Sequence, residues 1–456
     1  MTTNQNAADS AIAEVNKRYA VIMCGNKPQV MRESHTPDGE RALSFMSFSD
    51  AANLLANVTV SEKRQVKGKD VDASTPVFDL WKRSPTRRQY EGLVLSPANR
   101  YGAEFYNLWS GFAVEPLTVT ADKAAKDYCP LLLAHMKNIL CCGNEEHFQY
   151  LMAWCADIVQ DAEHKKGVAL VLRGNKGTGK SIFLDAMRDI IGKAHAMKVA
   201  HSKQLTGNFN SHLREKVLVV AEESFWSGDK SADGPLKDLI TARTVTIEAK
   251  GKDSVEMDSY VRVAMSTNND WAVPATRDER RYFVLDVSDA KAQDTEYFSD
   301  IADELEAMGK EAFLRVLMDF DLSNTNLRKV PETDGLKVQK SLSLEPHHRF
   351  MYDLVTGSRI GNDPLYWTAH DANGNSQDSH KVGKDLLYNA YVDYARRLGT
   401  LYPIVKEVFS KELLAATGAR GVRAMIAGNR EQVFELPSIK DALARFIAYT
   451  GICHAE

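Results

Sequence analysis

The sequence lacks long hydrophobic runs and paired cysteines. No stretch of about eighteen apolar residues occurs in the 456 residues, and no charged-then-apolar leader follows Met1. We therefore expect neither a membrane span nor a secreted protein. The 6 cysteines show none of the CxxC or Cys/His spacings of a zinc site or a disulfide framework. The expectation is an intracellular protein with buried, reduced thiols.

The chain also lacks a strong charge of either sign. Its 57 Lys and Arg residues and 61 Asp and Glu residues give a formal net charge of −4. This balance argues against a protein that coats nucleic acid over its whole surface. A ring that threads DNA needs positive charge only on its inner loops, so the net charge does not separate a helicase from a metabolic enzyme.

Hydrophobic periodicity divides the chain into regions of different character. Short apolar stretches separated by turns come first, then helical spacing, then strand-length apolar runs alternating with helical segments, which is typical of an α/β layer with a parallel sheet. The pattern predicts an N-terminal α+β accessory region (1–120), a helical collar (121–165), an α/β core (166–322), a polar linker (323–343) and a mainly helical C-terminal domain (340–456). The first 14 residues are expected to fray. A hairpin near 422–435 in the C-terminal domain is typical of a winged helix.

The strongest motif is GNKGTGKS, which matches the P-loop pattern GxxxxGK[ST]. A buried-strand run, VALVL (168–172), precedes it, and an amphipathic run, IFLDAMRDII (182–191), follows it. Glycines allow backbone N–H groups to turn onto phosphate oxygens, and the helix start adds its positive dipole end. Lys180 would neutralise the β and γ phosphates, and Ser181 would hold Mg²⁺. Against a chance glycine-rich turn, the context favours an ATP site formed by Gly174, Asn175, Lys176, Gly177, Thr178, Gly179, Lys180 and Ser181.

Two later strand ends carry groups suited to ATP hydrolysis. The run KVLVVAEES ends in Glu222, which we expect to bind Mg²⁺ through water, and Glu223, which we expect to orient the attacking water. The run YVRVAMSTNND ends in Asn268, whose amide can hydrogen-bond the γ phosphate and the water. The alternatives are surface glutamates that merely end a strand and an ordinary turn asparagine.

Three basic features are candidates for binding phosphates. Arg280 and Arg281 precede a strand, where they could act as arginine fingers on a neighbouring subunit or form surface ion pairs. Alternation over 243–257 predicts a hairpin whose tip carries Lys250 and Lys252, which would grip the backbone of DNA unless the tip is a solvated turn. A third feature is either a strand-binding surface or a solvated face, and it consists of two basic stretches around two aromatics: Lys63, Arg64, Lys67, Lys69, Lys82, Arg83, Arg87 and Arg88 around Trp81 and Tyr90.

In this order the motifs resemble the superfamily 3 helicases of viruses, plasmids and phages. The P-loop, acidic strand, hairpin, Asn-ended strand and arginines fall within little more than 100 residues, from Gly174 to Arg281. The stretch GPLKDLIT (234–241) before the hairpin looks like the poxvirus-type primase-helicases of phages and prophages. The resemblance, to the helicase portion of that family, implies an AAA+-like P-loop ATPase ring, usually a hexamer, that moves 3′ to 5′ on single-stranded DNA.

The sequence departs from that family in three places. The acidic pair is Glu-Glu where many members have an Asp, which leaves the metal geometry open. Thr241, Ala242 and Arg243 stand where relatives have a GGD-like turn, which puts DNA contacts there in doubt. No primase motif is visible, since the only DxD, Asp319 to Asp321, lies beyond the motor and is interpreted as surface. A separate primase is therefore an expected partner.

Three functions follow from these residues. The leading one is a replicative DNA helicase of phage or mobile-element type that hydrolyses ATP at the subunit interfaces of a ring and acts on single-stranded or forked DNA. The second is an ATP-dependent DNA-binding initiator or loader with little unwinding. The third, a small-molecule kinase, is disfavoured because Glu222 and Glu223 favour water as the acceptor. We expect no membrane association and a cytoplasmic location, in a bacterial host if the chain is encoded by a phage or mobile element.

Overall fold

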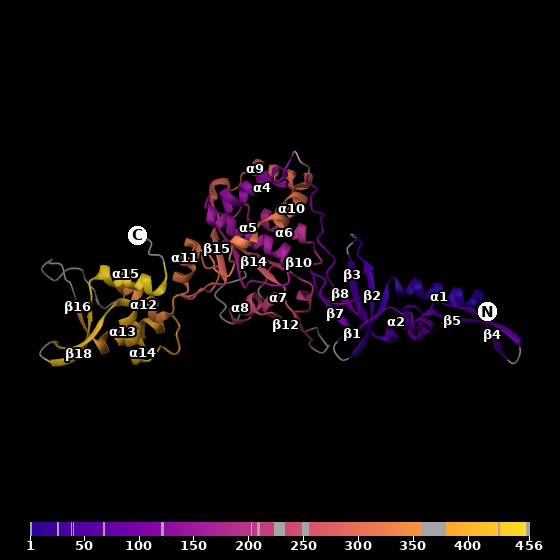
Figure 1. Ribbon diagram of the computed structural model, residues 1–456. Helices are drawn as coiled ribbons and strands as arrows, with labels where there is room; N and C mark the ends of the chain where they lie inside the picture. The colour runs from indigo at the N-terminus through magenta and orange to yellow at the C-terminus, as the bar shows by residue number, and fades with distance from the viewer. Residues whose placement is uncertain are drawn as a thin grey trace.

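The molecule consists of three units in a row, with the two termini at opposite ends (Figure 1). No helix in the described part of the chain is long and apolar enough to cross a membrane. The computed structural model describes residues 2–24, 27–37, 39, 41–66, 69–119, 123–201, 203–207, 210–222, 233–248, 255–356, 380–426 and 429–452.

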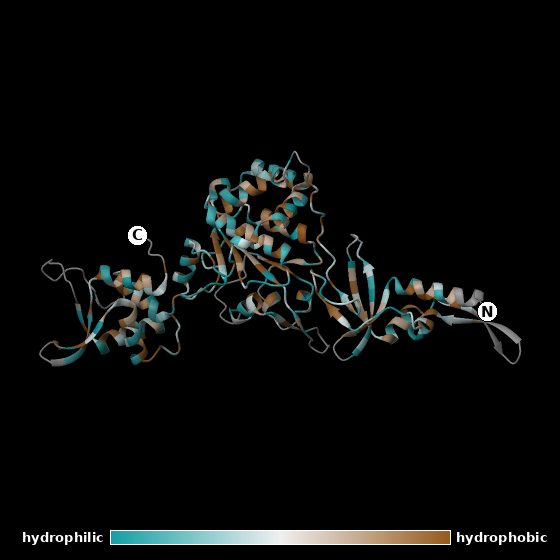
Figure 2. Ribbon diagram, in the orientation of Figure 1, coloured by the Kyte–Doolittle hydropathy of each residue, from teal (hydrophilic) through white to brown (hydrophobic). Residues whose placement is uncertain are grey.

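The central unit is built on a five-stranded sheet in the order β10-β11-β14-β9-β15, and every neighbouring pair is parallel. Both faces of the sheet are covered, so its strands are continuous apolar runs, brown in Figure 2. In β9, Leu170 and Leu172 join one core while Ala169 and Val171 join another, because successive side chains alternate between faces. The five strands are β9 (Ala169–Arg173), β10 (Ala196–Val199), β11 (Leu218–Glu222), β14 (Arg262–Thr267) and β15 (Tyr282–Asp286).

One face of this sheet carries most of the helices (Figure 1). The region expected to be a helical collar is helical, but Leu151 of α5 belongs to the same core as Phe283 of β15, so it is not a separate layer. This face carries α4 (Pro130–His135), α5 (Glu145–Gln160), α6 (Lys180–Ile191), α9 (Thr295–Glu304) and α10 (Lys310–Asp319), with short segments η1 (Ala125–Tyr128), η2 (Met136–Leu140), η4 (Asp289–Lys291), η5 (Leu305–Gly309) and η6 (Leu322–Asn324).

The other face carries shorter helices and part of the segment expected to be a linker. The core on this face includes Leu336 of α11 (Asp334–Leu342), so the expectation of a polar linker over 323–343 is wrong there. Gln339 is fully buried, and its Oε1 accepts hydrogen bonds from Ala272 N at 2.7 Å and Val273 N at 3.2 Å. The side-chain amide of Gln339 therefore hydrogen-bonds backbone N–H groups and not solvent. Also on this side lie α7 (Lys203–Thr206), η3 (Ser211–Leu213), α8 (Asp233–Thr241) and the antiparallel hairpin β12 (Thr244–Ile247) and β13 (Val255–Asp258).

The N-terminal unit is α+β, as expected, but its first residues do not fray. They form α1 (Thr2–Asn16), where Ile12 and Val15 pack in one core with Trp81. Trp81 is fully buried and its Nε1 donates to Asn16 Oδ1 at 2.8 Å, so Trp81 belongs to the core and not to a strand-binding surface. The side chains of Lys63, Arg64, Lys67 and Lys69 lie outside the described part.

A mixed four-stranded sheet in the order β3-β2-β1-β6 organises this unit. The β4–β5 pair is an antiparallel hairpin, and β7 and β8 pair in parallel. The elements are β1 (Tyr19–Cys24), β2 (Lys27–His35), β3 (Arg41–Met46), α2 (Phe48–Leu54), β4 (Thr59–Val66), β5 (Lys69–Pro76), α3 (Val77–Arg83), β6 (Gln89–Tyr90), β7 (Gly92–Val94) and β8 (Phe105–Asn107).

The C-terminal unit has a hydrophobic core of its own. The unit is mainly helical, as expected, and its hairpin lies where the sequence predicts it and gains a third antiparallel strand in the order β16-β18-β17. The name winged helix stays a prediction. The elements are α12 (Pro346–Val355), β16 (His380–Gly383), α13 (Lys384–Arg397), α14 (Lys406–Thr417), β17 (Arg420–Ile426), β18 (Asn429–Leu436) and α15 (Ile439–Thr450).

Candidate functional site

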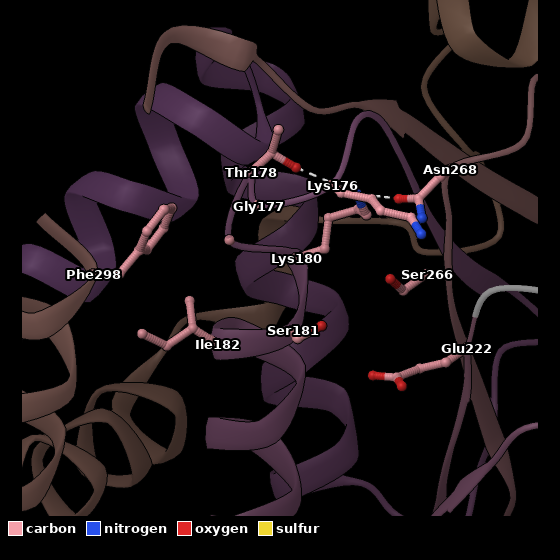
Figure 3. Close-up of a pocket in the computed structure, with 11 residues that line it drawn as sticks. Lys176, Gly177, Thr178, Lys180, Ser181, Ile182, Glu222, Ser266, Asn268 and Phe298 are labelled. Carbon is pink, nitrogen blue, oxygen red and sulfur yellow. Dashed lines mark hydrogen bonds between the residues drawn. The ribbon is translucent and has the colours of Figure 1, made fainter. Parts of the chain in front are cut away.

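A cavity of about 340 Å³ lies at the carboxyl end of the central sheet. Strand β14 runs between β9 and β11, so groups at its end lie between the loop that follows β9 and the acidic end of β11. The cavity is lined from both sides (Figure 3), by Lys176, Gly177, Thr178, Gly179, Lys180, Ser181, Ile182, Glu222, Ser266, Asn268 and Phe298. Residues that are almost ninety positions apart in the sequence therefore share one site.

The loop from β9 to α6 needs glycine for two reasons. Gly177 and Gly179 have φ values of +76° and +85°, in the left-handed region that favours glycine. A Cβ at Gly179 would also lie 2.5 Å from carbon atoms of His135 and of Phe298. Helix α6 begins directly after this glycine, so the N–H groups of its first turn, which a helix does not pair internally, lie at the cavity.

Lys180 is held over the loop by neutral acceptors. Its side-chain ammonium donates to Gly174 O and Asn175 O, both at 2.7 Å, and to Asn268 Oδ1 at 3.1 Å. The residue is only 6% exposed. Figure 3 shows Asn268 reaching from the end of β14 toward this ammonium. The arrangement fixes a buried positive charge at the mouth of the glycine loop.

Oxygen-bearing side chains lie on the opposite wall. Glu222 and Ser266 are direct partners in the β11–β14 register, and both side chains extend toward Ser181 at the start of α6 (Figure 3). Glu222 Oε1 pairs with Lys198 Nζ at 2.6 Å. Carboxylate and hydroxyl oxygens are the ligands that a hard cation such as Mg²⁺ takes. Ser266 is missing from the sequence-based site, although its place in an Asn-ended strand run could have identified it.

Glu223 lies outside the described residues, as do the hairpin residues Lys250 and Lys252. The two strands of the predicted hairpin are present, with Val245 opposite Met257. The roles assigned to these three side chains stay predictions.

Two residues that support the loop come from helices without any motif. The ring of His135 is fully buried beneath the loop, with Nε2 3.2 Å from Gly179 O and Nδ1 3.1 Å from Tyr297 OH. Since a carbonyl can only accept, Nε2 carries the proton and Nδ1 accepts from the tyrosine. Burial lowers the pKa of His135. With Phe298 of α9, this ring fixes the position of the loop from behind.

Arg280 and Arg281 lie at the other end of the sheet. They precede β15, whose Tyr282 pairs with Ala169 at the start of β9 and whose Asp286 pairs with Arg173 at its end. The length of β15, roughly 16 Å at about 3.3 Å per residue, therefore separates both arginines from the glycine loop. Within one chain they do not reach the cavity.

At that end the two arginines line a second cavity, of about 450 Å³, which we call the basic pocket. Its walls, as far as the described residues form them, contain no carboxylate and consist of Lys165, Lys166, Gly167, Val168, Thr241, Arg243, Arg280, Arg281 and Arg328. Arg281 pairs with Glu279 at 3.1 Å and Lys166 with Asp161 at 2.6 Å. For the side chains of Arg243, Arg280 and Arg328, no ion pair or hydrogen bond is recorded within the described ranges. Three uncompensated guanidinium groups make this pocket attractive to an anion.

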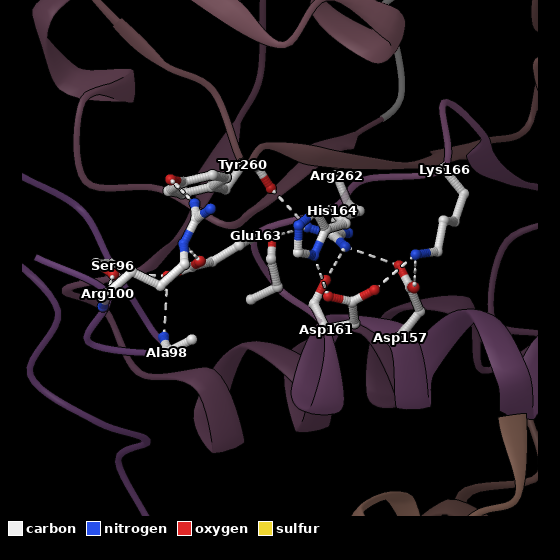
Figure 4. A network of polar contacts seen from close by, with 11 residues as sticks. Ser96, Ala98, Arg100, Asp157, Asp161, Glu163, His164, Lys166, Tyr260 and Arg262 are labelled. Atoms are coloured by element: carbon white, nitrogen blue, oxygen red, sulfur yellow. Dashed lines mark hydrogen bonds and ion pairs between the residues drawn. The ribbon is translucent and has the colours of Figure 1, made fainter.

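A buried polar network supports the basic pocket (Figure 4). Arg262 Nη2 pairs with Asp157 Oδ2 at 2.7 Å, with side chains 4% and 5% exposed, and Lys166 Nζ lies 3.5 Å from Asp157 Oδ1. Lys165 Nζ donates to Leu239 O at 2.9 Å and Ser259 Oγ at 3.0 Å. Burial and the nearby Arg262 lower the pKa of Lys165 to about 7.

The same network joins the N-terminal segment to the central unit. Glu163, whose side chain is 3% exposed, accepts from Ser96 Oγ at 2.7 Å and from Ala98 N at 3.0 Å, and it pairs with Arg100. Glu163 stands two residues before Lys165. The position of the basic pocket therefore depends on residues from three regions of the chain.

Comparison with known proteins identifies relatives of this chain. A family of unknown function (DUF5906) matches residues 172–281. Over 164 residues, or 34% of the chain, the sequence is 28% identical to the DNA primase-polymerase of Nitratiruptor phage NrS-1, and the match spans 23% of that protein's length. The apo structure of the NrS-1 C-terminal region has a TM-score of 0.60 at 16% identity and covers 93% of this chain and 97% of that one. An A-form apo structure of the same region gives a TM-score of 0.58 at 17% identity, with 93% and 98% coverage. The chain is thus similar in sequence to part of a phage DNA primase-polymerase, and it shares the fold of that protein's C-terminal region.

Proposed function

We propose that this chain is an ATPase motor of phage-type DNA replication, a DNA helicase that hydrolyses ATP at the subunit interfaces of a ring. The observation that carries the proposal is the convergence of Lys180, Ser181, Glu222 and Asn268 on one cavity at the carboxyl end of a parallel sheet. Ligands bind at this end of open α/β sheets. The four residue types are those that phosphate and magnesium binding require.

The cavity fits a triphosphate through the groups that already surround Lys180. Phosphate oxygens would replace the carbonyls of Gly174 and Asn175 as acceptors for the ammonium. This exchange would be favourable, because a charged acceptor makes a stronger hydrogen bond than a neutral carbonyl. The N–H groups at the start of α6 would add further donors. Asn268 contacts the ammonium and would lie beside the terminal phosphate.

Ser181 and Glu222 would hold Mg²⁺, because their oxygens and that of Ser266 converge beside the glycine loop. The ion, when bound, supplies positive charge that offsets the phosphate charge. Lys198 would then lose its partner, so Glu222 exchanges one cation for another. Glu223, the next residue in the sequence, is proposed to orient the attacking water.

Subunit assembly would complete the site. Arg280 and Arg281 stand at the sheet end away from their own cavity, and the basic pocket around them contains three arginines without a recorded partner in the described part. A neighbouring subunit's nucleotide would supply the missing negative charge. A closed ring with six subunits, as the helicase resemblance implies, would present each basic pocket to the next cavity.

The connection to DNA rests on the relatives. The similar phage protein is a DNA primase-polymerase, and this chain matches only part of it. We propose that the ring acts on single-stranded or forked DNA, that Lys250 and Lys252 grip the strand, and that a separate primase works alongside. A second candidate, an initiator or loader with little unwinding, is favoured by the separately packed C-terminal unit. A strand-displacement assay distinguishes the two.

The direct test is ATP hydrolysis by the purified chain with and without single-stranded DNA. We expect hydrolysis that needs Mg²⁺ and rises with DNA. Lys180→Ala should remove both ATP binding and hydrolysis, because the buried ammonium is the main positive charge at the loop. Lys126→Ala, at an exposed lysine of η1, is the control and should behave as the unmodified chain. Hydrolysis that survives Lys180→Ala would contradict the proposal.

A further inference from the structure

Away from both cavities, the C-terminal unit contains a cluster of metal-binding side chains. His347 and His348 lie in the first turn of α12, and Glu412 lies in the middle of α14. Each offers one ligand atom, and the three atoms all lie within 4.8 Å of one another. We call these three residues the His–Glu cluster. The expectation that the chain lacks a zinc site rested on cysteine spacing, and this cluster contains no cysteine.

The spacing suits a single ion. A point equidistant from three atoms that are 4.8 Å apart lies about 2.8 Å from each of them. Zinc binds imidazole nitrogen and carboxylate oxygen at about 2.0–2.2 Å, so each ligand atom needs to move by well under about 1 Å. Rotation of one side-chain torsion covers that distance. The backbone of the two helices can stay where it is.

Neighbouring residues hold the ligands in place. His348 packs edge-on against Tyr449, with ring centroids 5.8 Å apart, and also contacts Phe446 at 6.4 Å. The hydroxyl of Tyr449 donates to Glu412 Oε2 at 2.9 Å. Carboxylate ligands of metal ions are commonly hydrogen-bonded in this way, which fixes their orientation. The cluster is therefore already ordered around its centre.

A simple hydrogen bond explains only part of the cluster. His348 Nε2 lies 3.2 Å from Glu412 Oε2, and this pair needs no ion. It leaves His347 unexplained, because its ring lies with its centroid 4.1 Å from that of His348 and no hydrogen bond is recorded for it within the described ranges. We propose that the His–Glu cluster binds one zinc ion, with both imidazoles and the carboxylate as ligands.

The ligand set identifies the class of metal. Two imidazoles and one carboxylate suit zinc and similar transition metals, whereas Mg²⁺ and Ca²⁺ prefer oxygen ligands alone. Three protein ligands leave one position for water or a fourth group. The ion would join α12 to α14, and through Tyr449 to α15, and would stabilise the packing of these three helices.

The position of the cluster gives the ion a second consequence. The guanidinium of Arg277 lies over the ring of Tyr449, 4.5 Å from its centroid. Arg277 belongs to the loop that leads into Arg280 and Arg281. Zinc on Glu412 would fix Tyr449 and with it the contact between the C-terminal unit and this loop. The zinc site does not depend on the ATPase proposal, since neither its ligands nor its test involves nucleotide.

The test uses the full chain, freed of any affinity tag and stripped with a chelator. Zinc is then added by equilibrium dialysis, and bound metal is counted by mass spectrometry. Cobalt replaces zinc in a parallel titration, because its visible absorption reports tetrahedral nitrogen and oxygen ligands. We expect one tightly bound zinc per chain. His347→Ala and Glu412→Gln should each weaken binding by more than tenfold.

His35→Ala, at an exposed histidine of β2, is the matched control and should keep the full affinity. Thermal unfolding of each variant with and without zinc guards against folding defects, since each variant is compared with itself. Zinc should raise the Tm of the unmodified chain and of His35→Ala but not of the two cluster variants. Absence of bound zinc in the unmodified chain, or equal zinc binding by the cluster variants, would overturn the proposal.

Discussion

The two ends of the central sheet are built in opposite ways. At the carboxyl end, Lys180 is buried and donates to the carbonyls of Gly174 and Asn175, and Glu222 already has a cationic partner. At the amino end, Arg243, Arg280 and Arg328 surround the basic pocket without a recorded partner among the described residues. The first end is a nearly complete site whose own groups satisfy each other. Among the described residues, the second carries guanidinium groups without a carboxylate partner, and an added anion would balance their charge.

In the proposed ring, this difference explains why one chain alone is expected not to complete an ATPase site. Some arginines elsewhere in the molecule have carboxylate partners, as Arg173 has Asp286 at 2.6 Å and Arg88 has Glu33 at 2.6 Å. Uncompensated guanidinium groups that face one another repel, so the basic pocket costs stability in the isolated chain. A phosphate-bearing partner in the basic pocket would remove that cost. Substitutions at each end should therefore have different effects on ATP binding, hydrolysis and stability.

The largest loss of hydrolysis without a loss of ATP binding is expected from the amino end. Arg280→Ala combined with Arg281→Ala should lower ATP hydrolysis by about a thousandfold, the scale of an arginine finger, while ATP binding by the chain stays unchanged. Lys180→Ala should abolish binding itself. Mixing the two variants should restore part of the hydrolysis, since some interfaces then combine an intact cavity with an intact basic pocket.

Arg315→Ala is the control for this experiment, because Arg315 pairs with Asp319 on the exposed side of α10. Its ATPase rate, alone or mixed, should equal that of the unmodified chain. If no mixing ratio restores hydrolysis, the two ends do not meet between subunits.

A smaller effect is expected from the carboxyl end. Gly179→Ala should lower ATP hydrolysis by about a hundredfold, because the added Cβ would collide with His135 and Phe298 and displace the glycine loop. Gly234→Ala is the matched control, since a Cβ at Gly234 meets nothing within 4 Å. Steady-state ATPase rates and circular dichroism spectra of both variants provide the measurement. Equal rates would show that the loop tolerates displacement.

The smallest effect concerns the pH dependence of stability at the amino end. The pKa of Lys165 is about 7 in the folded chain, against 10.5 as its ordinary value. Between these pH values the unfolded chain binds more protons than the folded one, so Lys165 makes the free energy of unfolding rise with pH. Below pH 7 both states are protonated and the burial cost is fully present. The slope should stay below about 1.4 kcal/mol per pH unit, the value for one whole proton.

Lys165→Met should remove this contribution, so urea unfolding at pH 7, 8 and 9 should show the unmodified chain gaining stability relative to the variant. Lys126→Met serves as the control, because Lys126 is exposed. Identical slopes for the unmodified chain and Lys165→Met would mean that Lys165 stays charged when folded.

Local patterns were sufficient to predict the helices and strands around the site. The parallel sheet, the glycine loop, α6 and the β12–β13 hairpin follow from apolar runs, glycine spacing and alternation within a dozen residues. The same reasoning failed where long-range contacts decide. Residues 2–16 read as polar yet form α1, because Ile12 and Val15 find a core that includes Trp81. Gln339 lies in a segment predicted to be a linker, yet it is buried, and its side chain accepts hydrogen bonds from backbone N–H groups of another segment.

By itself the sequence determined where the glycine loop lies between a strand and a helix, since its glycines supply the left-handed backbone of Gly177 and Gly179 within a few residues. Only the tertiary structure decided which distant groups share a cavity. The strand order placed Ser266 and Asn268 between Lys180 and Glu222, and the parallel register placed Arg280 and Arg281 at the far end. The His–Glu cluster needed the packing of α12 on α14. Such contacts depend on which surfaces of the helices and strands pack together, and the spacing of residues in the sequence does not predict that packing.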